Sequence, residues 1–525
     1  MFREMKWSLA FVVSVLSACG DSDSPPPENP SDEAPNVAAT EAGRVRGVEQ
    51  DGVVRFLGVP YAAPPVGELR WRPPAPVEPW SDVRDASQFG LSCTQSAETE
   101  GPGSEDCLFL NVWTPEVRAE KPRPVMVYIH GGGWVRGAGR MSHLSGIENV
   151  LDGQNLAQRD DVVVVTLNYR LGSIGYLAHP AFAAENDAGS TGNYGLRDAI
   201  AALEWVHQNI REFGGDPERV LVFGTSAGGS QTCALAASPL ADGLFSVASA
   251  HSSGGCDCFR TDQAKAVAEA LADTVGCSAA DDVAACLREV PASTLVALPS
   301  SGAIADGEVL PMCPLETFQA GGGTHAPLVF GTTAHEAMGY LDDAAKALTW
   351  DSFGQVLDNS FGAKGADVAA AYGPSKYDSA PLAWVLFIGD WIYHCPDRRV
   401  LRALGGREEP LYRFVFGGIL SDERHVGMGA VHGNDVPFIF RNFGELSTTE
   451  AELNLSNTMA TTWAEIAATG KPPAFWAPWD ESGAFVGLGL DGVAMLIGHR
   501  DAECDVLDQV PALRDITVLP FPSAQ

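Results

Sequence analysis

The sequence predicts an α/β fold with a large, mostly parallel central sheet covered by helices on both faces. Short segments that are apolar throughout recur along the chain, and segments with helical periodicity lie between them. Strands that are apolar on both sides are typical of parallel sheets buried between two helical layers. Ligands of such proteins bind at the carboxyl ends of the strands. A ligand site is therefore expected at those strand ends.

The expected elements follow in chain order. Alternating residues over 44–60 predict hairpin strands. Leu196, Ile200 and Leu203 share one helical face and predict a helix over 196–213, with a second helix over 455–469. Unbroken apolar runs predict buried strands at 125–130, 162–168, 219–224, 245–250, 327–331 and 411–416.

The first residues have the features of an export signal. Arg3 and Lys6 precede an apolar run of about ten residues, shorter than the ~20 that span a bilayer. Leu16-Ser17-Ala18-Cys19 follows, which resembles the processing site of a bacterial lipoprotein. We expect a lipoprotein signal peptide over 1–18, with lipid attached to Cys19. An ordinary secretory signal with a chance cysteine is the alternative.

Residues 19–39 are expected to form a disordered tether, since they are polar and rich in proline up to Asn36 and cannot bury a core. No later stretch of the sequence is long and apolar enough to span a membrane. The expected location is exported and lipid-anchored, in the outer membrane or periplasm or at the cell surface. Gly20 after Cys19 is the usual pattern for sorting to an outer membrane.

The charge balance limits the expected partners. Lys and Arg number 34 against 67 Asp and Glu, a net charge of −33. A nucleic-acid binder needs a basic patch, and docking to anionic lipid needs the same. We therefore expect no nucleic-acid partner, and membrane contact only through the N-terminal lipid.

Cysteine usage agrees with export. If Cys19 carries lipid, ten of the eleven cysteines remain, an even number that can pair in an oxidising compartment. Short spacings favour Cys93–Cys107 and Cys277–Cys286. Cys233 lies in an expected helix over 227–237 and is interpreted as a buried free thiol. No CxxC pair has a matching partner, so no metal site is expected. The remaining cysteines stay unassigned at this point: Cys256, Cys258, Cys313, Cys395 and Cys504.

A Gly-x-Ser-x-Gly motif, Gly224-Thr225-Ser226-Ala227-Gly228, lies between an expected strand and an expected helix. Small residues are needed where the backbone turns sharply, and the turn presents the serine hydroxyl at a helix N-terminus. The pattern alone is a weak signal, but its position between strand and helix strengthens it. Ser226 is therefore the candidate nucleophile.

His130-Gly131-Gly132-Gly133-Trp134 follows an earlier expected strand. Glycines let backbone N–H groups turn toward a substrate, and an esterase needs such donors for the oxyanion of its tetrahedral intermediate. Ala227, directly after the candidate nucleophile, offers a further N–H. We predict an oxyanion hole built from Gly132, Gly133 and Ala227. A merely flexible glycine loop is the alternative.

Several segments together resemble the type-B carboxylesterase/cholinesterase family of α/β-hydrolases. The resemblance extends over roughly 40–510 and implies one α/β-hydrolase domain over 40–525 that needs no metal or cofactor. It also implies a third disulfide, Cys395–Cys504. The segments are FLGVPYAAPPVG (56–67), SEDCLFLN (104–111), HGGG (130–133), NYRLG (168–172), FGGDP (213–217) and GTSAGG (224–229).

The family places its catalytic residues in the order serine, acid, histidine. This implies Ser226 as nucleophile and Glu336 as acid, although relatives usually have Asp-Glu-Gly where this chain has His335-Glu336-Ala337. His432 lies in a segment that matches the family's His-Gly-x-acid pattern. Three further residues are alternatives here: Asp306 as a rival acid or structural turn, His425 as a second candidate base, and Asp435 as a residue that supports the imidazole or caps a helix.

Two departures from the family bear on the substrate. Thr225 stands where many relatives carry Glu, and the loop between Cys93 and Cys107 is short and has no Trp. In cholinesterases a longer loop supplies the indole that contacts the choline ammonium. Choline esters are therefore not expected as preferred substrates. Aromatic candidates for the pocket are Trp134 and Tyr340, with Trp391 and Tyr393 favoured as core residues.

The expected function is a serine carboxylic-ester hydrolase that acts on neutral esters with short or medium acyl chains through a Ser-Glu-His triad and an acyl-enzyme. Two alternatives stay open: a lipase or polyester hydrolase, and a non-catalytic, cholinesterase-like surface binding module. Retention of Ser226, Glu336 and His432 with the glycine-rich loop speaks against the binding module. The sequence does not assign an oligomeric state.

Overall fold

A computed structural model describes residues 34–95, 103–140, 146–186, 189–425 and 427–510. The expected signal peptide and the lipid site at Cys19 lie outside these residues. The first strand, β1 (Val37–Thr40), begins within the last residues of the expected tether, because Val37 and Ala38 are buried and pair with β2 (Gly43–Arg46). In the described residues no helix combines the length and apolarity that a membrane crossing requires.

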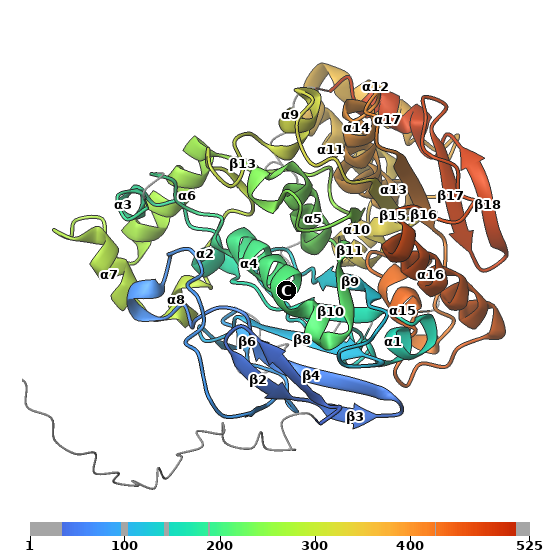
Figure 1. The fold of residues 1–525 in the computed structure, drawn as a ribbon. Helices are drawn as coiled ribbons and strands as arrows, with labels where there is room; N and C mark the ends of the chain where they lie inside the picture. Colours follow the sequence, from blue (N-terminus) through green and yellow to red (C-terminus); the bar gives the residue numbers. More distant parts are fainter. Residues whose placement is uncertain (1–33, 96–102, 141–145, 187–188, 426, 511–525) are drawn as a thin grey trace, which may run out of the picture. The chain divides into compact units, whose positions relative to one another are not determined.

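The centre of the fold is an 11-stranded sheet (Figure 1). Its middle strands are parallel, as predicted, whereas the pairs at both edges are antiparallel. The strands lie in the order β18 (Gly492–Ile497), β17 (Ala484–Gly489), β16 (Leu411–Phe416), β15 (Leu328–Thr333), β12 (Val247–His251), β11 (Gly215–Thr225), β9 (Arg123–Ile129), β10 (Val163–Leu167), β8 (Phe109–Thr114), β4 (Val53–Pro60) and β3 (Val48–Gln50).

Two core layers form because side chains alternate across the sheet. In β9, Val125, Val127 and Ile129 pack into one layer, while Met126 and Tyr128 pack into the other. Helices α4 (Tyr194–Asn209), α5 (Ala227–Ala237), α9 (Pro314–Gln319) and α14 (Cys395–Ala403) contribute to the first layer. Helices α1 (Gln154–Asp160), α15 (Asp435–Phe440) and α16 (Glu450–Thr469) contribute to the second.

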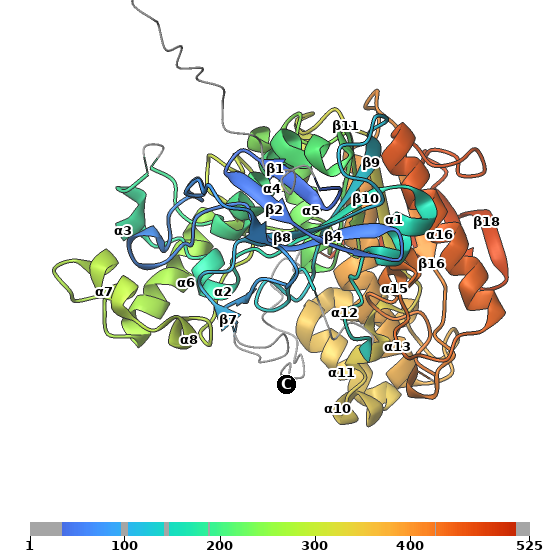
Figure 2. The ribbon, with the colours of Figure 1, turned by 60° about the horizontal axis from the view of Figure 1, so that its bottom comes forward.

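Two further groups of helices lie apart from each other beyond the sheet (Figure 2). One group consists of α2 (Gly172–Gly175), α3 (Pro180–Ala183), α6 (Thr261–Thr274), α7 (Val283–Glu289) and α8 (Ala292–Leu295). The other consists of α10 (Asp343–Lys346), α11 (Trp350–Phe361), α12 (Gly365–Ala371), α13 (Ala380–Gly389) and α17 (Asp501–Leu507). Short strands complete the fold: β5 (Arg84–Asp85), β6 (Ser92–Cys93), β7 (Gly103–Ser104), β13 (Phe259–Arg260) and β14 (Ile304–Ala305).

The helix expected over 455–469 begins earlier, at Glu450. Thr449 accepts the N–H of Glu452, and the Glu452 carboxylate accepts the N–H of Thr449. This reciprocal capping box starts the helix before its apolar face begins. The Thr-x-x-Glu spacing is visible in the sequence and would have placed the start correctly.

Five disulfides join the described cysteines, and the three pairs expected from the sequence are among them: Cys93–Cys107, Cys277–Cys286 and Cys395–Cys504. The interpretation of Cys233 as a free thiol is wrong, because it pairs with Cys256. Helix α5 presents Cys233 to the loop that follows β12, and sequence spacing does not reveal that contact. Cys258 pairs with Cys313.

Candidate active site

Ser226 occupies the sharp turn between β11 and α5. Its backbone has φ 63° and ψ −128°, a conformation that non-glycine residues rarely adopt. The turn is held by the N–H of Ser226, which donates to the His251 carbonyl at 3.0 Å. A Cβ on Gly224 or Gly228 would come within 2.6 or 2.0 Å of the Ile129 carbonyl oxygen. Both glycines of the motif are therefore required by close backbone approach.

The glycine loop after β9 lies directly beside the nucleophile. A Cβ on Gly131 would stand 2.6 Å from the Thr225 carbonyl oxygen and 2.9 Å from the Ser226 Cβ. Gly132 and Gly133 have positive φ values of 115° and 63°. The structure thus brings the predicted oxyanion loop next to Ser226.

Glu336 and His432 form a hydrogen-bonded pair. Glu336 Oε2 lies 2.7 Å from His432 Nδ1, and the His432 N–H donates to the Glu336 carbonyl. The other carboxylate oxygen accepts the Thr333 N–H and the Ser252 hydroxyl, each at 2.6 Å. The Glu336 side chain is fully buried, so these donors compensate its charge. Nδ1 of His432 therefore carries a proton, and Nε2 is left as the acceptor.

Ser226 and this pair both follow the carboxyl ends of central parallel strands. Ser226 follows β11 and Glu336 follows β15, and β12 lies between these parallel strands. His251, whose carbonyl holds Ser226, is followed by Ser252, whose hydroxyl holds Glu336. His432 Nε2 is buried and has no hydrogen-bond partner among the described residues, so the Ser226 hydroxyl is not bonded to it in this structure. Such contacts often tighten only when substrate binds.

His335, a departure from the family pattern, has a role in placing His432. Its N–H donates to the Ala430 carbonyl at 3.0 Å, and its Nδ1 accepts the Ala430 N–H at 3.2 Å. Gly429, at φ 71°, packs against the same imidazole. Burial lowers the pKa of His335, which keeps the ring neutral and able to accept this bond. His335 therefore anchors the turn before His432 to the segment that carries Glu336.

The rival candidates lie in other settings. Asp306 accepts the N–H groups of Glu308 and Leu310, as expected of a structural turn. His425 lies in the 3-10 turn Glu423–His425, where its N–H donates to the Asp422 carbonyl. Neither is hydrogen-bonded to Glu336 or His432 in the described structure. Asp435 bonds to His251 instead of capping α15.

Of the two aromatic residues expected in the core, Trp391 lies there, whereas Tyr393 packs against His432. Tyr340 is 39% exposed, and its hydroxyl lies 2.9 Å from that of Tyr393. Tyr393, which was favoured as a core residue, is buried but packs on His432 with ring centroids 4.7 Å apart. It belongs to the site. Trp391 packs among core aromatic rings, as expected.

Two further candidates are neighbours of the site in the sequence. Trp134, after the glycine loop, is partly buried at φ 69°, and its indole packs edge-on against Tyr176. Thr225, directly before Ser226, is buried and brings no charge to the site. Burial lowers the pKa of His130 to about 4, and its ring stacks on Tyr169. His130 is thus neutral and supports the loop from behind.

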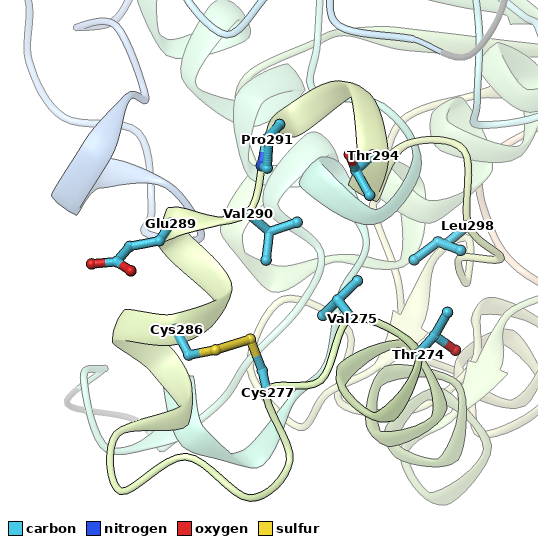
Figure 3. Close-up of a pocket in the computed structure, with 9 residues that line it drawn as sticks. All are labelled: Thr274, Val275, Cys277, Cys286, Glu289, Val290, Pro291, Thr294 and Leu298. Carbon is cyan, nitrogen blue, oxygen red and sulfur yellow. A yellow bond between two sulfur atoms is a disulfide. The ribbon is translucent and has the colours of Figure 1, made fainter.

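The structure also contains a cavity of about 470 Å³ beside the Cys277–Cys286 disulfide (Figure 3). It lies between α6, α7 and α8, and none of the predicted catalytic, oxyanion-hole or substrate-pocket residues lines it. Nor do the described residues contain a group of His, Cys, Asp or Glu side chains that could hold a metal ion. The strand-end cluster is therefore the candidate active site.

The sequence model of the carboxylesterase family matches residues 34–506. The chain belongs to this family. Carboxylesterases are also its relatives in pairwise comparison: it is 34% identical to fumonisin B1 esterase of Sphingopyxis macrogoltabida over 492 residues, 87% of each chain. It is 33% identical to para-nitrobenzyl esterase of Bacillus subtilis over 469 residues, 84% of this chain and 92% of the relative.

A solved structure of a PNB esterase has the same fold. It superposes with a TM-score of 0.78 at 29% sequence identity and covers 90% of this chain and 99% of the solved chain. The carboxylesterase is therefore an α/β-hydrolase with a large mixed sheet, and it is a serine ester hydrolase.

Proposed function

We propose that this carboxylesterase hydrolyses neutral esters with short or medium acyl chains, with Ser226 as nucleophile, His432 as general base and Glu336 as the carboxylate that orients His432. The proposal is carried by the 2.7 Å bond between Glu336 and His432, which lies at the carboxyl ends of the parallel strands, where Ser226 also lies. The bond leaves Nε2 of His432 as the atom that takes the serine proton.

The reaction proceeds in two acyl transfers. Ser226 Oγ attacks the ester carbonyl carbon while its proton passes to Nε2 of His432. The carbonyl oxygen becomes an oxyanion held by the N–H groups of Gly132, Gly133 and Ala227. His432 then gives its proton to the leaving alkoxide as the C–O bond breaks, and an alcohol departs. Water repeats these steps on the acyl-enzyme, releasing the acid and restoring Ser226.

The surroundings of Ser226 support a neutral substrate. Thr225 is buried and uncharged where many relatives carry Glu, which removes an attraction for cationic substrates. The partly exposed Tyr340 offers apolar surface near His432, because its hydroxyl bonds to Tyr393, whose ring packs on the His432 imidazole. The names of the relatives, among them a pyrethroid hydrolase of Rattus norvegicus, indicate different ester substrates. The proposal therefore specifies only that the ester is neutral and that its acyl chain is short or medium.

The proposal is tested with purified protein on chromogenic p-nitrophenyl esters of increasing acyl length. We expect wild-type hydrolysis to peak at short or medium chains and Ser226→Ala to abolish it. Wild-type hydrolysis no faster than the uncatalysed background would make the chain a binding module instead, and equal rates above background for the two proteins would exclude Ser226 as nucleophile. A maximum at long-chain emulsions or polymer films would make it a lipase or polyester hydrolase.

We further propose that the enzyme is exported and anchored by lipid at Cys19, after removal of residues 1–18. Support comes from the disulfides of the described chain, which are typical of oxidising compartments. Cys19→Ser should abolish incorporation of labelled fatty acid and move the esterase out of the membrane fraction. The lipid anchor would be contradicted if wild-type protein took up no labelled fatty acid and Cys19→Ser fractionated in the same way as wild type.

A further inference from the structure

A second histidine–carboxylate pair lies buried behind the nucleophile. His251 ends β12 and Asp435 begins α15, and each side chain is 1% exposed. His251 Nδ1 lies 2.6 Å from Asp435 Oδ2, although the residues are 184 positions apart in the chain. The reaction proposed above does not use this pair.

The protonation of His251 follows from its other ring nitrogen. Nε2 lies 3.2 Å from Nε1 of Trp463. An indole N–H can only donate, so Nε2 accepts and the ring proton sits on Nδ1. His251 is therefore neutral and donates to the Asp435 carboxylate, in the same tautomer that His432 adopts beside Glu336.

The pair cannot be a second catalytic centre. The Ser249 hydroxyl lies 2.8 Å from His251 Nε2, which gives the composition of a serine triad. However, Ser249 is fully buried, and the Trp463 N–H shares with it the lone pair that would take the serine proton. The rings of Phe414 and Trp463 pack edge-on against the imidazole. No substrate carbonyl can reach this serine.

The pair does connect two segments that the reaction must hold together. The carbonyl of His251 accepts the N–H of Ser226 at 3.0 Å, so His251 belongs to the strand behind the nucleophile. Asp435 ends the turn His432-Gly433-Asn434-Asp435, which carries the base. A hydrogen bond to a carboxylate is stronger than a neutral one, particularly when buried. The bond between His251 and Asp435 thus links β12, which holds the Ser226 backbone, to the turn that carries His432.

We infer that His251 and Asp435 are positioning residues, whose bond holds the His432 turn in register with Ser226. This inference rests on the proposed function, because it assigns the pair a role through His432. Without the bond the turn can shift, and a displacement of about 1 Å lowers turnover by about 100-fold. Substrate binding should change little, because neither side chain is exposed to the substrate.

The test compares carboxylate-to-amide changes at the two ends of α15. Asp435→Asn weakens the pair at its start. Asp160→Asn is the matched control, because buried Asp160 bonds to Arg441 at 2.8 Å just after the other end of the helix. We measure kcat, KM and the pH profile of kcat on a p-nitrophenyl ester, together with Tm.

We expect Asp435→Asn to lower kcat at least about tenfold and to leave KM within about threefold of the wild-type value. We also expect it to shift the pH profile of kcat, because it removes a residue that helps to orient the general base. Asp160→Asn should lower Tm without these kinetic changes. A wild-type kcat and pH profile in Asp435→Asn, or equal losses in both variants, would overturn the inference. If Asp435→Asn does not fold, His251→Gln replaces it in the same comparison, because the glutamine amide takes the place of Nε2 and does not replace the Nδ1–H that donates to Asp435.

A readout independent of turnover separates this inference from the proposed function. In protein labelled with ¹⁵N-histidine, the Nδ1–H resonances of His251 and His432 report each pair. Asp435→Asn should change both resonances, and Asp160→Asn neither. An unchanged His432 resonance overturns the positioning role even if the enzyme is active. Equal hydrolysis by wild type and Ser226→Ala overturns the proposed function alone.

Discussion

Oε2 of Glu336 lies 2.7 Å from Nδ1 of His432, although the two residues are 96 positions apart in the chain. The bond joins the end of a central strand to a turn that packs against it, and it assigns the ring proton of His432 to Nδ1. Because Glu336 also accepts from Thr333 and Ser252, its position is held from three directions.

Glu336→Gln should lower kcat/KM by about 10³ to 10⁴-fold, since an amide can hold the imidazole in the wrong tautomer and cannot stabilise its cation. Assays of p-nitrophenyl ester hydrolysis measure the decrease in kcat/KM. Glu308→Gln, at a partly exposed carboxylate in the Asp306 turn, serves as control and should retain activity. Comparable losses in both variants would contradict the role given to Glu336.

His432→Gln should remove nearly all turnover, because it removes the imidazole that Glu336 orients and that is proposed to take the Ser226 proton. His425→Gln tests the second candidate base and should retain turnover, since His425 has no bond to Glu336 in the described structure. The rate at which an organophosphate phosphorylates Ser226 gives a measure of its activation that does not depend on turnover. Loss of phosphorylation in His425→Gln with retention in His432→Gln would exchange the two assignments.

Gly131→Ala should lower kcat by about 100-fold or more while the protein still folds. The added methyl group would meet the Thr225 carbonyl oxygen at 2.6 Å and the Ser226 Cβ at 2.9 Å, which displaces the nucleophile from the oxyanion loop. Gly339→Ala is the matched control, because nothing lies within 4 Å of its added Cβ. Full activity in Gly131→Ala would show that this close approach is not needed.

Asp397→Asn should stabilise the protein at neutral and alkaline pH. Burial raises the pKa of the Asp397 carboxyl to about 7, while Oδ1 accepts from Ser253 and Gly255. As pH rises from about 3.8 to about 7, the unfolded chain loses this proton and the native chain keeps it, so native stability falls. The amide cannot ionise and still accepts both bonds.

The expected gain in the free energy of unfolding is up to about 4 kcal/mol at pH 8, at about 1.4 kcal/mol per pKa unit, and near zero below pH 3.8. Denaturant unfolding at several pH values measures it. A gain that does not depend on pH would mean that Asp397 is ionised in the native protein or affects stability by another route.

Much of the site is encoded locally and was therefore predictable. The turn at Ser226 needs small flanking residues, and these appear as a motif between an apolar strand and a helix. The parallel strands are apolar on both faces, which identifies them in the sequence. The family resemblance then implied Glu336 and His432 as partners, since neither residue has a local signature of comparable strength.

Other features depend on which segments meet in space. Tyr393 was assigned to the core because an aromatic side chain at helical spacing looks the same whether it packs on leucine or on His432. The pairing of Cys233 with Cys256 and the bond of His251 to Asp435 likewise link segments whose spacing carries no periodic signal.

The sequence by itself determined the class of sheet and the strand–turn–helix position of Ser226, because periodicity and turn chemistry act over a few neighbouring residues. The order of the candidate catalytic residues was implied by the family resemblance. Tertiary structure alone decided what supports them: Ser252 under Glu336, Tyr393 on His432, and His251 against Asp435. Those contacts join segments that are distant in the sequence, and burial makes each unpaired polar group costly enough to require such a partner.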